Sequence, residues 1–182
     1  PSGRLGACVP DRRAPGRRDR GVGGAGMADS VRRHPTASKL FTGGVAEQSC
    51  YWSQTVYYAD ARAEVLCKCR PDYVKAISGG YVIVDLKTTL DARERPFQGR
   101  AYWDLGYHLS AAHYVTGLTE IRGTPPQAFI FVAVEKEPPY AGFHSTKEVS
   151  KEGPGDKRGD FECSFHSTKE VSKGGNRFYK DF

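Results

Sequence analysis

Residues 69–89, with the sequence CRPDYVKAISGGYVIVDLKTT, place two aspartates and a lysine around a run of β-branched residues. The second half of this stretch, residues 80–89, is rich in Val, Ile, Tyr and Thr, which favour β-strands. A Ser-Gly-Gly turn signal separates it from the preceding apolar run, residues 65–74. We therefore predict two adjacent strands, and these strands decide how the charged residues are arranged.

Side chains alternate between the two faces of a strand, so Asp85 and Lys87 are neighbours on one face of the predicted strand. Tyr81 and Ile83 share that face, whereas Val82, Val84 and Leu86 point to the other. On the preceding strand Lys68, Arg70 and Asp72 share a face, and pairing of the two strands brings Asp72 within a few ångströms of Asp85.

Two carboxylates that converge in a partly buried place repel each other unless a cation lies between them. Carboxylate oxygens are ligands that Mg²⁺ or Mn²⁺ prefers. A lysine beside such a metal orients an attacking water and balances charge on a phosphorane-like transition state. Asp72, Asp85 and Lys87 therefore predict a metal-dependent site that cuts phosphodiesters.

The rest of the central region predicts an α/β (α+β) fold in the order helix, three strands, helix, strand, with a mixed central sheet flanked by helices. The expected elements are a helical stretch over residues 27–41 interrupted at Pro35, a meander of strands over 46–58, 65–74 and 80–89, a helix over 96–118 and a buried strand over 127–135. In the second helix Phe97, Ala101, Leu105, Leu109 and Ala112 recur at helical spacing. Trp103, Tyr107, Ser110 and Tyr114 form the opposite stripe, which either touches the site or DNA or is only an amphipathic face.

The net charge of +6 is concentrated at the N-terminus, where residues 1–34 carry eight arginines and three aspartates. Residues 1–26 are rich in Arg, Gly and Pro and have almost no periodicity, so we expect a disordered tail. The segment FHSTKEVSK occurs at 143–151 and again at 165–173. Two such copies cannot form a repeat stack, so residues 142–182 are expected to be poorly ordered and the domain to span 27–141.

Five scattered cysteines do not suggest a disulfide framework, and Cys67 and Cys69 alternate on one strand as small hydrophobes rather than metal ligands. The sequence has no apolar run of about 18 residues and no secretory signal, so we expect no membrane contact and a cytoplasmic location.

The motifs RPD and VDLKT resemble the signature of the PD-(D/E)xK nucleases. The segments HPTASKLFTGGVAEQSCYW, LCKCRPDY, VIVDLKTT, YHLSAAHYV and FIFVAVEKEPPYA, spread in order over residues 27–141, are similar to the RecE-like branch, the nuclease domain of phage and prophage exodeoxyribonuclease VIII. This resemblance implies a restriction-endonuclease-like core. It also implies a Mg²⁺-dependent 5′ to 3′ exonuclease that acts on double-stranded DNA ends in a bacterial or phage-infected cell.

Carried over by the resemblance, Asp72 and Asp85 bind metal, the Leu86 carbonyl completes the inner shell and Lys87 serves the attacking water. Glu47 stands where the family often has a further acid. Arg70 either reaches a DNA phosphate or offsets Asp72, and Tyr107, Ser110 and Tyr114 are the other expected DNA contacts. The family further implies a single-strand annealing recombinase as partner and a ring-shaped homo-oligomer.

The chain departs from the family at two points. A Gln-x-x-x-Tyr pair usually follows the lysine strand, and here the matching positions are Ser110 and Tyr114. A metal-binding histidine upstream of the first acid has no counterpart, because His34 lies in a segment that matches another part of the family, and we expect an incomplete domain. An inactive remnant or DNA-binding accessory protein is the alternative. An iron–sulfur nuclease is a weaker third possibility, because its cluster needs four suitably placed cysteines and the closely spaced Cys67 and Cys69 do not supply that pattern.

Taken singly, each of these residues has a simpler interpretation. Asp72 after Pro71 is also typical of a turn at a strand end, and a strand lysine such as Lys87 is also typical of an edge that resists aggregation. Only their combination indicates a nuclease site.

Overall fold

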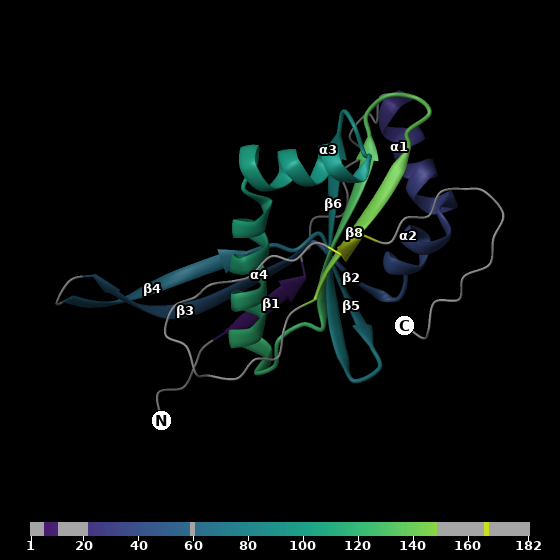
Figure 1. Cartoon of the computed structure of the whole chain (residues 1–182). Helices are drawn as coiled ribbons and strands as arrows, with labels where there is room; N and C mark the ends of the chain where they lie inside the picture. Colours follow the sequence, from purple (N-terminus) through teal and green to yellow (C-terminus); the bar gives the residue numbers. More distant parts are fainter. Residues whose placement is uncertain (1–5, 11–21, 59–60, 149–165, 168–182) are drawn as a thin grey trace.

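The structure, a computed structural model, describes residues 6–10, 22–58, 61–148 and 166–167. In chain order the elements are β1 Ala7–Pro10, α1 Val22–Arg33, α2 Pro35–Leu40, β2 Gly44–Ala46, β3 Gln48–Tyr58, β4 Ala61–Cys69, β5 Tyr73–Ile77, β6 Gly80–Thr89, α3 Glu94–Gly99, the π-helix η1 Arg100–Asp104, α4 Tyr107–Arg122, β7 Ala128–Glu135, β8 Gly142–Glu148 and β9 His166–Ser167 (Figure 1).

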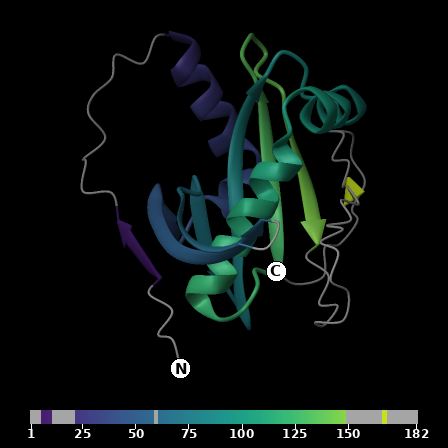
Figure 2. The same ribbon diagram turned by 90° about the vertical axis from the view of Figure 1, so that its left-hand side faces the viewer.

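The main sheet has six strands in the order β2-β5-β6-β7-β8-β9. Its central pair, β6 and β7, is parallel, and the pairs around it are antiparallel, so the sheet is mixed as the sequence predicts. Helix α4 lies on one side of this sheet, and α1 and α2 lie on the other (Figures 1 and 2). Helices thus flank a mixed sheet on both faces.

The central strands are apolar because both of their faces are covered. Ile83 on β6 and Phe129 and Phe131 on β7 pack in one cluster with residues of α3 and α4. Val82 and Val84, the alternate residues of β6, pack in a second cluster on the opposite face, against α1 and α2. The predicted alternation along residues 80–89 is therefore confirmed.

The expected meander of three strands is wrong. The run 65–74 is divided into β4 and β5, which belong to different sheets, because Arg70, Pro71 and Asp72 form a bend between them. Proline offers no N–H to a strand ladder and restricts the residue before it, so pairing stops here. Strands β3 and β4 form a long hairpin in a three-stranded sheet with β1, and β5 and β6 form a second hairpin in the main sheet.

The single helix expected over residues 96–118 is also interrupted. Gly106 adopts a left-handed conformation with φ of 59° and turns the chain sharply between η1 and α4 (Figure 1). The turn shifts the phase of the helical stripe, so Leu105 and Leu109 are exposed rather than buried. The buried residues of α4 are Ala111, Val115, Gly117 and Leu118.

The two expected tails contain ordered elements. Strand β1 and the first turn of α1 fall within residues 1–26, which we expected to be disordered. Residues 142–148, expected to be poorly ordered, form β8 because they pair along β7, and β9 from the second copy of the repeat pairs with β8 at Ser145 and Ser167. The rest of both segments lies outside the described residues, and the proposed domain limits stay a prediction.

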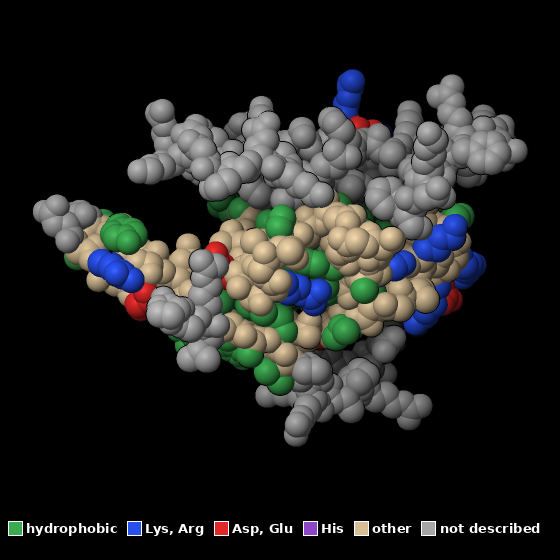
Figure 3. Space-filling view, turned by 90° about the horizontal axis from the view of Figure 1, so that it is seen from below, with side chains coloured by type: hydrophobic (Ala, Val, Ile, Leu, Met, Phe, Trp, Pro, Cys, Tyr) green, Lys and Arg blue, Asp and Glu red, His purple; other side chains and the backbone are tan. Residues whose placement is uncertain are grey.

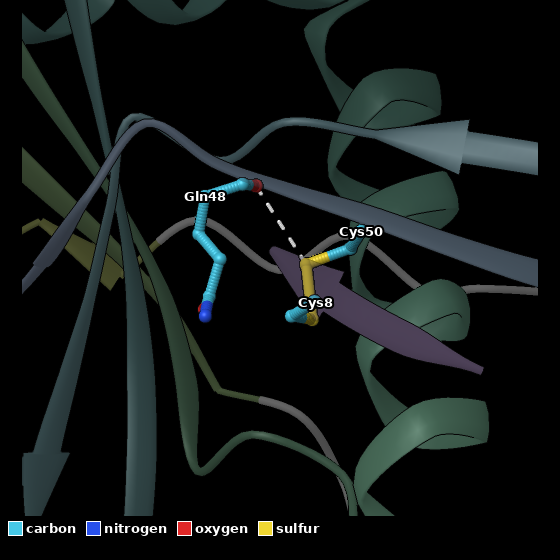
Figure 4. The surroundings of a disulfide bond; sticks show 3 residues. All are labelled: Cys8, Gln48 and Cys50. Atoms are coloured by element: carbon cyan, nitrogen blue, oxygen red, sulfur yellow. Dashed lines mark hydrogen bonds between the residues drawn. A yellow bond between two sulfur atoms is a disulfide. The ribbon is translucent and has the colours of Figure 1, made fainter. Parts of the chain in front are cut away.

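The expectation of no disulfide is wrong for Cys8 and Cys50, which form a bridge between β1 and β3 (Figure 4). The two residues are direct partners in the β1–β3 ladder, and the carbonyl oxygen of Gln48 lies 3.6 Å from Cys50 Sγ. Cys67 and Cys69 are free thiols that pack in or against the core, and burial raises the pKa of Cys69 to about 12. Cys163 lies outside the described residues. Within the part of the chain described, no helix is long and apolar enough to cross a bilayer.

Helix α4 is held against the β3–β4 hairpin by a tight contact between Gly117 and Trp52. The Trp52 side chain is almost completely buried, and a Cβ atom added at Gly117 would lie 2.5 Å from its ring. The ring centre of His113, one turn earlier on α4, lies 4.9 Å from that of Trp52. The His113 Nε2 atom also forms a hydrogen bond of 3.1 Å with the Lys68 carbonyl oxygen. A glycine is therefore required at position 117 by close approach.

We predict that Gly117→Ala lowers the free energy of unfolding by about 1–3 kcal/mol, because the added methyl group overpacks a filled site. Gly99→Ala is the matched control, since Gly99 is also helical but nothing lies within 4 Å of its added Cβ. That variant should gain about 0.5–1 kcal/mol from helix propensity. Urea unfolding of both variants checks the prediction, and equal shifts of the two midpoints would contradict it.

Candidate active site

Asp72 is positioned by the bend that ends β4 and by the first residues of β5. Pro71 is fully buried and anchors the bend. In the β5–β6 ladder Tyr73 is opposite Val84, so the next position along the register places Asp72 beside Asp85. The Leu86 N–H donates a hydrogen bond of 2.8 Å to Asp72 Oδ2, which holds this carboxylate against β6.

Asp85 and Lys87 form an ion pair on the face of β6 that is turned toward α4. Lys87 Nζ lies 2.6 Å from Asp85 Oδ2, and the exposed fractions of the two side chains are 24% and 4%. The carboxylate is thus enclosed while the ammonium group keeps access to solvent. This pair lies beside the buried Phe131, the direct β7 partner of Asp85.

The two acids and the lysine perturb each other electrostatically. Burial raises the pKa of Asp85 to about 6; Lys87 opposes this shift, and the neighbouring Asp72 adds to it. For Lys87, burial alone would lower the pKa, but the charges of Asp85 and Asp72 outweigh burial and raise it. Lys87 is therefore protonated at neutral pH and is suited to stabilising negative charge rather than to accepting a proton.

Tyr107 and Tyr114 of α4 bring their rings to this face of the sheet. The Lys87 Nζ atom lies 4.9 Å from the centre of the Tyr107 ring, and that ring stacks on Phe131 at 5.9 Å. Tyr114 packs against Phe129, and burial together with the charge of Asp85 raises the pKa of its hydroxyl. Ser110 is exposed on the helix between the two tyrosines.

Glu47 and Arg70 lie at the rim of the site. Glu47 has a positive φ of 51°, and its N–H donates to the Asp72 carbonyl at 3.0 Å. Its carboxylate pairs with Arg70 Nε at 3.0 Å. Among the described residues no three metal-binding side chains gather in one cluster, so Glu47 does not join the two aspartates here. Its role as a metal ligand stays a prediction, as does that of the Leu86 carbonyl.

His34, the histidine nearest to the family's upstream position, has a structural role. Its Nδ1 accepts a hydrogen bond of 3.2 Å from the Ala37 N–H and caps α2. Helix α2 packs on the face of the sheet opposite to Asp85. His34 therefore belongs to the other side of the domain.

The residues at the site fit a magnesium-type ion by the chemistry of their donors. Asp72 and Asp85 supply two carboxylates close enough to raise the pKa of Asp85, and Mg²⁺ commonly binds one or two carboxylates and completes its shell with water. Zinc sites in proteins are usually built from His and Cys ligands, which this pair of carboxylates does not supply.

Sequence reasoning brought the three charged residues together but missed the contact between Lys87 and Tyr107. Tyr107 was expected on a helix face that touches the site or DNA, or that is only amphipathic, and its contact with Lys87 was not predicted. The sequence did place Tyr107 on the helix that follows the lysine strand, which could have indicated a residue near Lys87. The direction of its ring, however, depends on the turn at Gly106, where α4 begins.

A mixed sheet flanked by helices, with one acid before a hairpin and an Asp-x-Lys set on the next strand, defines the restriction-endonuclease-like class, the PD-(D/E)xK superfamily of nucleases. Within that superfamily the chain belongs to the family described as PDDEXK-like domain of unknown function (DUF3799), which matches residues 23–174. Nucleases of this superfamily generally use divalent metals. A comparison with curated proteins finds no match.

We predict that the metal-free protein loses stability as the pH rises from about 4 to about 6. The pKa of Asp85 is about 6 in the folded chain against an ordinary value of 3.8, so the folded state binds more protons in this window. Ionisation of the buried carboxyl then lowers the free energy of unfolding by about 1–3 kcal/mol across the window. Denaturant unfolding in EDTA at a series of pH values measures this slope.

The matched protein for this measurement is Asp85→Asn, which cannot ionise at position 85. Its stability should change less between pH 4 and pH 6 than that of the natural chain, while other carboxyls contribute equally to both proteins. Identical slopes for the two proteins would show that Asp85 titrates normally.

Proposed function

We propose that this chain is a metal-dependent nuclease that hydrolyses phosphodiester bonds of DNA. The observation that carries the proposal is the enclosed Asp72, Asp85 and Lys87 set, in which a buried carboxylate of raised pKa is held beside both a second carboxylate and a protonated lysine. This intact set supports an active nuclease over an inactive remnant or a DNA-binding accessory protein.

In this proposal Asp72 and Asp85 hold a divalent cation, with Mg²⁺ or Mn²⁺ as the ion that suits two carboxylates. When bound, the cation would polarise the scissile phosphate and lower the pKa of an attacking water. The Leu86 N–H keeps Asp72 oriented through its 2.8 Å hydrogen bond. Burial of Asp85 and its ion pair with Lys87 restrict the movement of its carboxylate, which limits the rearrangement needed to bind the ion.

Lys87 acts on the reacting phosphate. Its ammonium group pairs with Asp85 and is still 24% exposed, so it can orient a water and stabilise charge that develops on the phosphate oxygens. The Lys87 ammonium group packs over the ring of Tyr107 as a cation–π contact, and this ring stacks on Phe131. Tyr107 is thus a positioning residue for Lys87.

The resemblance to exodeoxyribonuclease VIII supports a narrower form of this proposal. In that form the substrate is the end of linear double-stranded DNA, the polarity is 5′ to 3′, and the 3′ strand passes to an annealing recombinase in the cytoplasm of a bacterial or phage-infected cell. A ring-shaped homo-oligomer belongs to the same proposal. Arg70, Ser110 and Tyr114, which line the rim or the adjoining helix, are its DNA contacts.

We predict that the chain shortens end-labelled linear duplex DNA with Mg²⁺ or Mn²⁺ and not with EDTA. Lys87→Ala should lower the rate at least about 100-fold, because a group that stabilises transition-state charge is removed. Lys75→Ala is the matched control, since Lys75 lies on the neighbouring β5 strand and its Nζ bonds to the Lys39 carbonyl away from the site. Equal activity in EDTA, or equal loss in both variants, would contradict the proposal.

The same assay separates the narrower form from the general one. Closed circular duplex should resist an exonuclease and be cut by an endonuclease, and release of label from the 5′ end before the 3′ end would support the 5′ to 3′ polarity. Cleavage of closed circles at the same rate as linear DNA would support the general nuclease proposal and contradict the exonuclease proposal.

We further predict that Tyr107→Phe keeps the activity while Tyr107→Leu lowers kcat about 3- to 30-fold, since the contact with Lys87 is made by the ring and not by the hydroxyl. KM should change less than kcat, because Tyr107 acts on the position of Lys87. Steady-state kinetics with Mg²⁺ measure both constants. A loss in Tyr107→Phe equal to that in Tyr107→Leu would assign the effect to the hydroxyl instead.

A further inference from the structure

The β3–β4 hairpin projects from the body of the protein as an arm (Figures 1 and 3). Every described residue of β4 from Ala61 to Leu66 is exposed, and Tyr57 and Tyr58, close to the tip of the hairpin, are exposed by 74% and 85%. Large exposed side chains gathered on one projecting element mark a candidate interaction surface.

The register of the hairpin divides its side chains between two faces. Tyr57 is opposite Arg62, Ser53 is opposite Leu66 and Tyr51 is opposite Lys68, so these residues share one face. We call it the tyrosine–cation face; Arg70, the first residue after β4, follows its inner end at the bend. The other face begins with the buried pair Cys50 and Cys69, is followed by the buried Trp52 opposite the half-buried Cys67, and continues outward through Val56, Val65 and Tyr58.

Each end of the tyrosine–cation face pairs an aromatic with a basic side chain, Tyr57 with Arg62 and Tyr51 with Lys68. Tyr57 and Leu66 are each 74% exposed, and Lys68 Nζ lies 5.4 Å from the centre of the Tyr51 ring. Hydrophobic, basic and acidic side chains are visible together on the arm in Figure 3.

Arg62, Lys68 and Arg70 supply three positive charges to this face, whereas Glu64 is its negative charge. Glu64 already accepts from Thr55 Oγ1 at 2.7 Å and pairs with Arg62 at 3.6 Å. At the inner end, Arg70 pairs with Glu47 and precedes Asp72 by two residues. The inner end of the face is therefore joined through the bend at Pro71 to Asp72, the first acid of the candidate site.

We propose that the tyrosine–cation face binds single-stranded DNA and guides it between the arm and the site; the choice of DNA rests on the proposed function. Proteins that bind single strands combine a positive track for the phosphates with aromatic side chains on which unpaired bases stack. A duplex could use only the cations, because its bases are already stacked. The eight steps along the chain from Arg62 to Arg70 span about 26 Å, which suits roughly four nucleotides.

The test is the binding of a fluorescein-labelled dT12 oligonucleotide, followed by anisotropy in EDTA with the full chain carrying Lys87→Ala. No cleavage occurs under these conditions, so the readout stands even if the chain proves to have no nuclease activity. Tyr57→Ala should weaken binding between about 5- and 150-fold, the loss of one stacked base. Lys68→Gln should weaken binding and reduce its dependence on salt, because one phosphate contact is removed.

Tyr58→Ala is the matched control, since Tyr58 is the adjacent tyrosine, is similarly exposed and lies on the opposite face. The Tyr58→Ala variant should bind dT12 as tightly as the parent does. In Tyr57→Ala, the affinity for a 12-base-pair duplex should fall less than the affinity for dT12. Absence of dT12 binding, or equal losses in both tyrosine variants, would overturn the proposal. So would unchanged DNA affinity in Tyr57→Ala combined with loss of self-association in sedimentation, which would assign the face to a second copy of the chain.

Discussion

The register between β5 and β6 is the constraint on which the site depends. Because Tyr73 is paired with Val84, Asp72 is held beside Asp85, and two carboxylates meet at a place where burial already disfavours charge. Backbone pairing, with several hydrogen bonds per strand, is strong enough to hold this unfavourable approach. In the proposed function this electrostatic cost would favour the binding of a cation, and Lys87 offsets part of it in the metal-free protein.

Packing on the α4 side of the sheet extends this electrostatic arrangement. Lys87 rests over Tyr107, and Tyr107 rests on Phe131, which is itself the β7 partner of Asp85. The ring can reach this position because the chain turns at Gly106 and begins α4 in a new direction. The charged residues are therefore in direct contact with the hydrophobic core, and a change in the orientation of α4 would change the position of the Lys87 ammonium group.

The bend from Arg70 to Asp72 connects the site with the projecting hairpin. Pro71 ends the pairing of β4, so the strand that forms the outer edge of the arm leads directly into the first acid of the site. Arg70 and its partner Glu47 stand where the arm, β2 and β5 meet.

What the sequence by itself determined was local. The two-residue alternation put Asp85 and Lys87 on one face, the apolar run at residues 127–135 marked a buried strand, and Pro35 marked the break between α1 and α2. These features depend on neighbours in the chain, whose spacing a strand or helix sets.

Tertiary structure decided the features that depend on distant contacts or on one backbone angle. The bend at Pro71 assigned β4 and β5 to different sheets, and the left-handed Gly106 changed the phase of the helix and directed Tyr107 to Lys87. The Cys8–Cys50 bridge and the pairing of β8 with β7 join segments that the sequence pattern treats as tails. Such pairings form when folding brings the edges of distant strands together. The periodicity of the sequence indicates where a strand lies but not which other strand it will pair with.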